Sequence, residues 1–149
     1  MILANRYILP VPRATLERID RSSSPAHRGR LRHAIDFVAP SGTPVLAAAD
    51  GVVTLVSDKS YTGGPSMEYW NDTNFVVIAH AGGEYSRYDH LQHKSAEVTV
   101  NRHVRAGQRI ARVGMTGFTY LPHLHFQVFV FTGPNPLTDF DTVPLPDFR

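Results

Sequence analysis

Pro122-His123-Leu124-His125-Phe126 lies inside an apolar run and places two histidines one residue apart. Side chains of a β-strand alternate between its two faces, so we expect His123 and His125 on one face and Leu124 and Phe126 on the other, toward a core. Two imidazoles on one strand face can bind a metal ion and the water that it activates. The motif alone also fits one buried, hydrogen-bonded histidine beside a half-exposed one.

Outward from this stretch, the chain alternates short apolar runs with turns. The runs cover residues 34–38, 45–49, 52–56, 74–79, 84–88, 97–100, 109–113 and 124–131. Asp50-Gly51, between two of these runs, is typical of a hairpin turn. No long segment has helical periodicity, so the sequence predicts an all-β fold of antiparallel sheets arranged as a sandwich or barrel.

Composition limits the kind of site that this chain can build. It has 149 residues, enough for one domain with a core, and a net charge of +2 that does not demand a nucleic-acid partner. It has no cysteine, which excludes disulfides, thiolate ligands and a cysteine nucleophile. A tightly held metal must therefore be bound by His, Asp or Glu.

No apolar run is long enough to cross a bilayer, so we expect no transmembrane segment. The first residues, 1–6, lack the long apolar segment of a secretory signal. On these grounds a cytoplasmic location is not excluded, and the sequence is silent on the oligomeric state.

Asp36 stands inside the apolar run 34–38. A carboxylate in such a strand is costly unless it is paired, protonated or bound to a metal. One interpretation is a metal ligand. The other is an ion pair with one of the nearby arginines, Arg28, Arg30 or Arg32.

The other histidines need individual interpretation. His90 follows the run 84–88 and precedes a polar stretch, where it could serve catalysis or simply face solvent. Three further histidines lie in turn-like or polar segments, and we expect them at the surface: His80, His93 and His103.

An ordered set of short blocks resembles the lysostaphin/LytM-type zinc endopeptidases. The blocks are Asp36 to Val53, Asn74 to His80, Tyr88-Asp89-His90-Leu91, Gly107 to Ile110, Val113 to Gly117, and Pro122 to Phe126. Each block is weakly specific, but independent short motifs rarely occur in the same order by chance. The resemblance implies a LytM-type domain that hydrolyses peptide bonds of peptidoglycan cross-bridges or stem peptides, usually outside the membrane, in the cell envelope.

The resemblance also implies one Zn²⁺ per chain, held by a histidine, an aspartate and the second histidine of H-x-H. Carried over to this chain, Asp36 and His125 are ligands, whereas His123 and His90 are catalytic histidines that do not bind the metal. Three protein ligands would leave one coordination position for water, as a catalytic zinc requires. The chain has no H-E-x-x-H, so a glutamate-based zinc site is not expected.

The position of the first histidine ligand differs from the commonest pattern of the family. The commonest family motif has a histidine four residues before the aspartate, and this chain has Arg32 there. His33 has an odd offset from Asp36, which on a regular strand puts it on the opposite face. His27, nine residues before Asp36, could return over the site through a loop with a glycine. We favour His27 as the ligand and keep His33 as the alternative.

We expect residues 1–149 to form a single metallopeptidase domain. Residues 1–26 would be an N-terminal approach segment, 27–131 the catalytic core and 132–149 an extended C-terminal tail. The polar loop 57–72 and the segment 118–121 would frame the cleft. A different interpretation is a catalytically inactive LytM-like module that binds or activates a partner in the cell envelope, and a structural β domain is a third.

Overall fold

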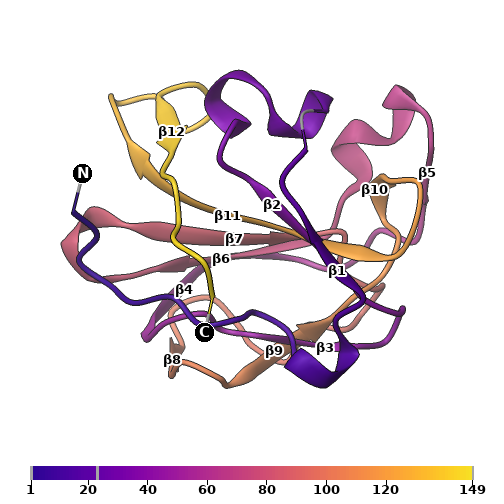
Figure 1. Cartoon of the computed structure of the whole chain (residues 1–149), viewed down its shortest axis with the longest axis horizontal. Helices are drawn as coiled ribbons and strands as arrows, with labels where there is room; N and C mark the ends of the chain where they lie inside the picture. Colours follow the sequence, from indigo (N-terminus) through magenta and orange to yellow (C-terminus); the bar gives the residue numbers. More distant parts are fainter. Residues whose placement is uncertain (1, 23, 149) are drawn as a thin grey trace.

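One eight-stranded sheet is the framework of the chain in this computed structural model, which describes residues 2–22 and 24–148 (Figure 1). The strands are β1 (Arg18–Asp20), β2 (Ile35–Val38), β4 (Gly51–Ser57), β6 (Phe75–Ala79), β7 (Tyr85–Asp89), β8 (His103–Val104), β11 (His123–Phe131) and β12 (Phe140–Thr142). Their order in space is β1-β2-β11-β7-β6-β4-β8, with β12 paired to β11 beside this path. Every pairing within this sheet is antiparallel.

Two small sheets and several short 3₁₀ turns complete the described chain. β3 (Pro44–Leu46) pairs antiparallel with β9 (Arg109–Arg112), and β5 (Gly63–Gly64) pairs parallel with β10 (Gly117–Phe118). The 3₁₀ turns are η1 (Arg13–Thr15), η2 (Pro25–His27), η3 (Gly29–Leu31), η4 (Met67–Asp72) and η5 (Ala81–Gly83). The expected all-β class with antiparallel sheets is therefore confirmed.

The two faces of the main sheet have different roles because side chains on β11 alternate. Leu124, Phe126 and Val128 are fully buried in the hydrophobic core, where the ring of Phe126 contacts the rings of Phe37 and Tyr88. In Figure 1, β3 and β9 lie below the main sheet, whereas η2 and η3 lie above β11. The alternate residues of β11 face away from the core, and they include both histidines of the H-x-H motif.

The segments before and after the predicted core add strands to the main sheet. β1 in the approach segment pairs with β2, and β12 in the tail pairs with the end of β11. The tail, which was expected to be extended, thus contains a strand of the main sheet. Its prolines bracket residues 140–142, which can still offer backbone hydrogen bonds to β11. The run 97–100 forms no strand, although Val98 is buried in the core.

His80 is buried, which contradicts its expected place at the surface. Its Nδ1 lies 2.7 Å from the carbonyl oxygen of Asp50, and its Nε2 lies 2.7 Å from the hydroxyl of Ser86. The ring of Tyr7, from the approach segment, packs edge-on against the imidazole at 5.4 Å. This contact from a distant segment could not be inferred from the residues next to His80 in the sequence, which lead into a glycine-rich turn.

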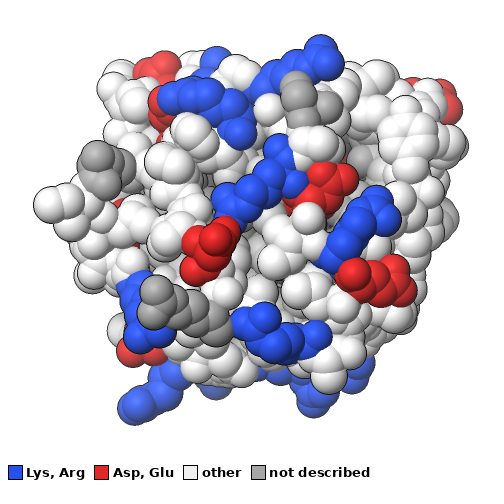
Figure 2. Space-filling model, viewed as in Figure 1, with Lys and Arg blue, Asp and Glu red and all other residues white. Residues whose placement is uncertain are grey.

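Charged side chains are dispersed over the face that Figure 2 shows. Lysine and arginine are scattered there, and several have an acidic side chain beside them. No helix among residues 2–22 and 24–148 combines the length and the apolar character needed to span a bilayer.

Replacement of Phe126 by Ala tests the central place of β11 in the core. Phe126 is fully buried, so the cavity should lower the free energy of unfolding by about 3–5 kcal/mol. Urea denaturation measures the change, with Leu137→Ala as the control because Leu137 is 82% exposed. Equal, small effects of the two substitutions would contradict this assignment of the core.

Candidate metal centre

Three side chains from separate parts of the chain converge on the face of the main sheet opposite the core. They come from His27 in η2, Asp36 in β2 and His125 in β11, and one potential ligand atom of each lies within 4.8 Å of the others. Oδ1 of Asp36 is 3.0 Å from Nε2 of His27 and 3.3 Å from Nδ1 of His125. Asp36 and His125 are cross-strand partners in the β2–β11 pairing, which accounts for their proximity.

The cluster contains polar atoms that are buried but unpaired. Both ring nitrogens of His27 and Oδ1 of Asp36 have no hydrogen-bond partner among the described residues. The 3.0 Å contact between His27 and Asp36 thus brings the atoms close without hydrogen-bond geometry. Buried polar groups normally have partners, and leaving them unpaired is costly. Nitrogen and carboxylate donors directed at one point are the ligands that Zn²⁺ takes in proteins, so this set fits a metal ion.

Asp36 is ionised in this environment. Burial raises the pKa of its carboxyl, but the imidazoles of His125 and His27 outweigh burial and hold the pKa well below its ordinary value. The alternative ion pair with Arg32 does not form, because Arg32 donates two hydrogen bonds to Asp141, at 2.7 and 2.8 Å. A charged carboxylate among histidines is suited to a cation.

His33, the alternative first ligand, lies outside the cluster. The group of potential ligands contains His27 instead, which η2 presents from the loop that precedes β2. His33 is half-buried, and its backbone N–H donates to the hydroxyl of Thr142 at 3.2 Å. His33 lies in the turn that precedes β2, so the alternation of strand side chains does not set its position.

His123 lies beside the cluster with one nitrogen directed toward it. Its Nε2 is 3.6 Å from Oδ1 of Asp36, and its Nδ1 is 2.9 Å from the carbonyl oxygen of Leu121. A carbonyl oxygen can only accept, so the proton of the neutral ring is on Nδ1 and the lone pair is on Nε2. Burial lowers the pKa of His123 despite the opposing charge of Asp36. The neutral ring therefore offers an acceptor to the cluster.

His90 is held beside His123 by an unusual backbone conformation. Its φ is +67°, which is uncommon for a residue other than glycine, and its N–H donates to the hydroxyl of Thr73 at 3.0 Å. The ring nitrogen Nδ1 donates to the carbonyl oxygen of Thr116 at 2.7 Å, and the His90 and His123 ring centroids are 4.6 Å apart. Burial lowers the pKa of His90 to about 4, and the neighbouring imidazole of His123 adds to the effect because two adjacent rings do not readily carry a proton each. His90 is thus neutral at pH 7.

Backbone carbonyl groups on either side of β10 accept hydrogen bonds from His90 and His123, the two histidines beside the cluster. The sequence did not predict this support. Thr116 accepts from His90 just before β10, and Leu121 accepts from His123 shortly after it. The exposed rings of Trp70 and Tyr120 each contact Phe118, at 6.2 and 5.5 Å between centroids. The loop 57–72 and the segment 118–121 are therefore in contact, beside the histidines.

Gln127 is a second feature that sequence analysis missed. Its Oε1 accepts a hydrogen bond from Nε2 of His125 at 3.0 Å, and its side chain is buried. This bond places the ring proton on Nε2 and leaves the Nδ1 lone pair facing Asp36. The alternation that puts His123 and His125 on one face includes Gln127, so the same argument would have identified it.

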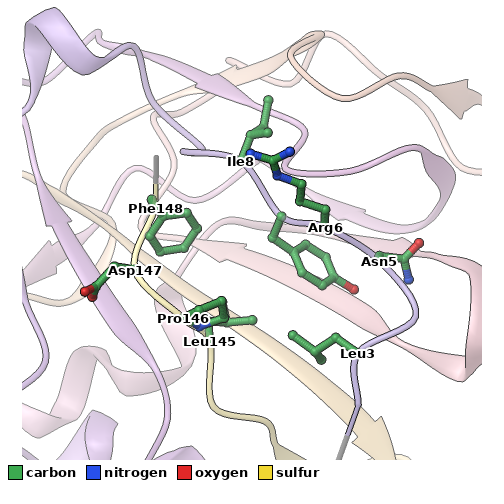
Figure 3. A pocket seen from close by; sticks show the side chains of 9 residues that line it. Leu3, Asn5, Arg6, Ile8, Leu145, Pro146, Asp147 and Phe148 are labelled. Carbon is green, nitrogen blue, oxygen red and sulfur yellow. The ribbon is translucent and has the colours of Figure 1, made fainter.

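A hollow of about 570 Å³ lies away from the cluster, between the approach segment and the tail (Figure 3). It is lined by residues 3, 5–8 and 145–148, whose side chains project from the two segments. None of these residues belongs to the histidine cluster, so this hollow does not contribute to the chemistry described above.

Comparison with known sequences supports one family. The sequence pattern of Peptidase family M23 matches residues 30–136. The chain is 40% identical over 113 residues to DD-carboxypeptidase/endopeptidase Mpg of Neisseria meningitidis serogroup B, covering 75% of this chain and 23% of that protein. It is 38% identical over 105 residues to peptidoglycan DD-endopeptidase ShyC of Vibrio cholerae, covering 70% and 20%. The chain thus spans about a quarter or less of these relatives.

Solved structures have the same architecture. A zinc-containing peptidase from Vibrio cholerae superposes with a TM-score of 0.64 at 30% identity, covering 97% of this chain and 40% of that one. The catalytic domain of lysostaphin from Staphylococcus simulans superposes with a TM-score of 0.55 at 29% identity, covering 74% of each chain. The resemblance noted from the sequence blocks to the lysostaphin/LytM-type family is therefore confirmed.

Replacement of Gln127 by Leu tests the support of His125. Without the Oε1 acceptor, the proton of His125 is free to move to Nδ1, so we expect metal affinity to fall about 10- to 100-fold. Competition with a chromogenic zinc chelator measures the affinity, and Gln127→Glu, which keeps an acceptor, is the control. Unchanged affinity in Gln127→Leu would show that the hydrogen bond does not orient His125.

Proposed function

We propose that this chain, which belongs to peptidase family M23, is a zinc-dependent endopeptidase that hydrolyses peptide bonds of peptidoglycan. The observation that carries the proposal is the convergence of His27, Asp36 and His125, with buried and unpaired polar atoms on His27 and Asp36. His123 and His90 stand beside this cluster, as a hydrolytic site requires. A single domain over residues 1–149 would contain all of these residues.

Zinc would be held by His27, Asp36 and His125. When bound, zinc supplies a Lewis acid that lowers the pKa of a coordinated water from 15.7 to about 7 and polarises a carbonyl group. The three protein ligands leave room for water, as in other catalytic zinc sites. Gln127 holds the imidazole of His125 with its Nδ1 lone pair toward the cluster.

His123 is the residue that we assign as general base. Its Nε2 lone pair faces the cluster while Leu121 fixes its other nitrogen, so the ring can take a proton from the attacking water without reorienting. The same nitrogen then holds that proton for the amine that leaves when the peptide bond breaks. The neighbouring negative charge of Asp36 favours the protonated ring during this step.

His90 is assigned to orienting the water. Its Nδ1–H is committed to the carbonyl oxygen of Thr116, so the neutral ring offers an acceptor on Nε2 and no donor there. The low pKa of about 4 keeps the ring neutral at pH 7. Of the two roles open to this residue, acceptance of a hydrogen bond from the water therefore fits better than donation to an oxyanion.

The relatives guide the choice of substrate. ShyC is named a peptidoglycan DD-endopeptidase and Mpg a DD-carboxypeptidase/endopeptidase, so we infer a scissile bond between D-amino-acid residues of peptidoglycan stem peptides. Such a substrate places the protein in the cell envelope. An inactive module that binds this polymer is the competing function, and metal content and hydrolysis distinguish the two.

Replacement of His123 by Ala should separate catalysis from metal binding. The variant loses its general base, so hydrolysis of purified peptidoglycan should fall about 10²- to 10⁴-fold while zinc remains bound. Release of soluble fragments measures hydrolysis, and metal analysis of protein purified without added metal measures zinc. Hydrolysis at the wild-type rate would refute the role of His123.

Replacement of His125 by Ala should instead remove the metal. We expect about one zinc per chain in the wild type and a loss of both zinc and hydrolysis in the variant. Replacement of the exposed His103 by Ala is the control, because it changes neither quantity. A wild-type protein that binds peptidoglycan but contains no zinc would favour the inactive binding module.

A further inference from the structure

We propose that β12 (Phe140–Thr142) is a clasp that positions His27, and that Thr142 is the positioning residue within it. The proposal rests on the metal site of the proposed function, because it explains how the first ligand of that site is held. It assigns a role to a part of the chain that sequence analysis treated as an extended tail.

The loop that carries His27 has little regular structure of its own. η2 and η3 are 3₁₀ turns of three residues each, without side-chain caps, and they are joined near Gly29, whose φ is +57°. Among the described residues of 24–34, backbone-to-backbone hydrogen bonds run only within this segment, such as His27 N–H to the carbonyl of Ser24. These local bonds shape the loop but do not fix it to the sheet.

Thr142 forms hydrogen bonds with two backbone groups of the loop. Its hydroxyl donates to the carbonyl oxygen of Arg30 at 2.7 Å and accepts from the backbone N–H of His33 at 3.2 Å. Thr142 is 2% exposed, so water does not readily replace these bonds. One buried hydroxyl therefore satisfies two backbone groups, one within η3 and one just after it, and connects the loop to the sheet.

Two further contacts, closer to the surface, join β12 to the same loop. Arg32 forms its paired hydrogen bonds with Asp141, and the guanidinium of Arg30 lies 5.3 Å from the ring centroid of Phe140. The Arg32–Asp141 pair is substantially exposed, so we expect it to contribute less than the buried hydroxyl. All three residues of β12 thus contact η3 or the residues just after it, in the segment that follows His27.

β12 is in turn fixed to the strand that carries the second histidine ligand. Thr142 is paired with Phe129, and Phe140 with Phe131, on the same strand β11 that contains His125. The pairing of β12 with β11 therefore determines the distance between the loop and His125. A ligand on an irregular loop needs such support, since metal sites depend on groups that orient the ligands.

The clasp lies outside the part of the chain that defines the family. The M23 pattern covers residues 30–136, whereas His27 precedes it and β12 follows it. Arg32, which stands at the commonest position of the first ligand, binds Asp141 in β12 in this chain.

The test compares the zinc affinity of Thr142 variants of the full chain by chelator competition. Thr142→Val removes both hydrogen bonds at nearly constant volume, and we expect affinity to fall about 10- to 100-fold. Thr142→Ser keeps the hydroxyl and should restore affinity to near that of the wild type. Thr138→Val is the matched control, because Thr138 is exposed in the same tail. Circular dichroism verifies folding, and Thr142→Ala replaces Thr142→Val if the latter does not fold.

A double-mutant cycle shows whether Thr142 acts through His27. In a His27→Ala background, Thr142→Val should not weaken zinc binding further, because the ligand that it positions is already absent. Equal effects of Thr142→Val with and without His27 would overturn the clasp and indicate general destabilisation. Unchanged affinity in the single variant would also overturn it. A wild type that binds no zinc would instead refute the metal site itself, and with it the role of the clasp.

Discussion

The pairing of Asp36 in β2 with His125 in β11 is the constraint on which the site depends. A slip of one residue in this register would move the histidines of β11 to the core face and leave Leu124 and Phe126 in solvent. Burial of these apolar side chains therefore fixes the register, and the register brings the carboxylate to the imidazole. The energetics of the core and the geometry of the site are two consequences of the same alternation.

Three of the histidines at the site, His90, His123 and His125, each have a hydrogen-bond partner on the side away from the cluster. Gln127 accepts from His125, Leu121 from His123 and Thr116 from His90, so each neutral ring carries its proton on the nitrogen away from the cluster. Lone pairs are thereby directed inward without any rearrangement. Oδ1 of Asp36 and the ring nitrogens of His27 lie buried and unpaired beside these rings, where such atoms are costly without a partner.

Much of this arrangement follows from local rules applied to the sequence. Strand alternation predicted that His123 and His125 share a face, and the apolar runs separated by turns predicted the all-β class. His33, expected on the face of the strand opposite Asp36, lies in the turn before β2 and outside the group of His27, Asp36 and His125. The first two inferences succeed because each depends on residues that are close together in the chain, where backbone geometry leaves few alternatives.

Contacts between distant segments were decided only in the folded protein. The strand β12 within the expected tail, the burial of His80 beneath Tyr7 and the commitment of Arg32 to Asp141 all join residues far apart in sequence. Hydrogen bonds and packing of this kind depend on the path of intervening loops, which local propensity does not specify. The composition and order of residues thus indicated the chemistry, whereas tertiary packing brought His27 close to Asp36 and His125.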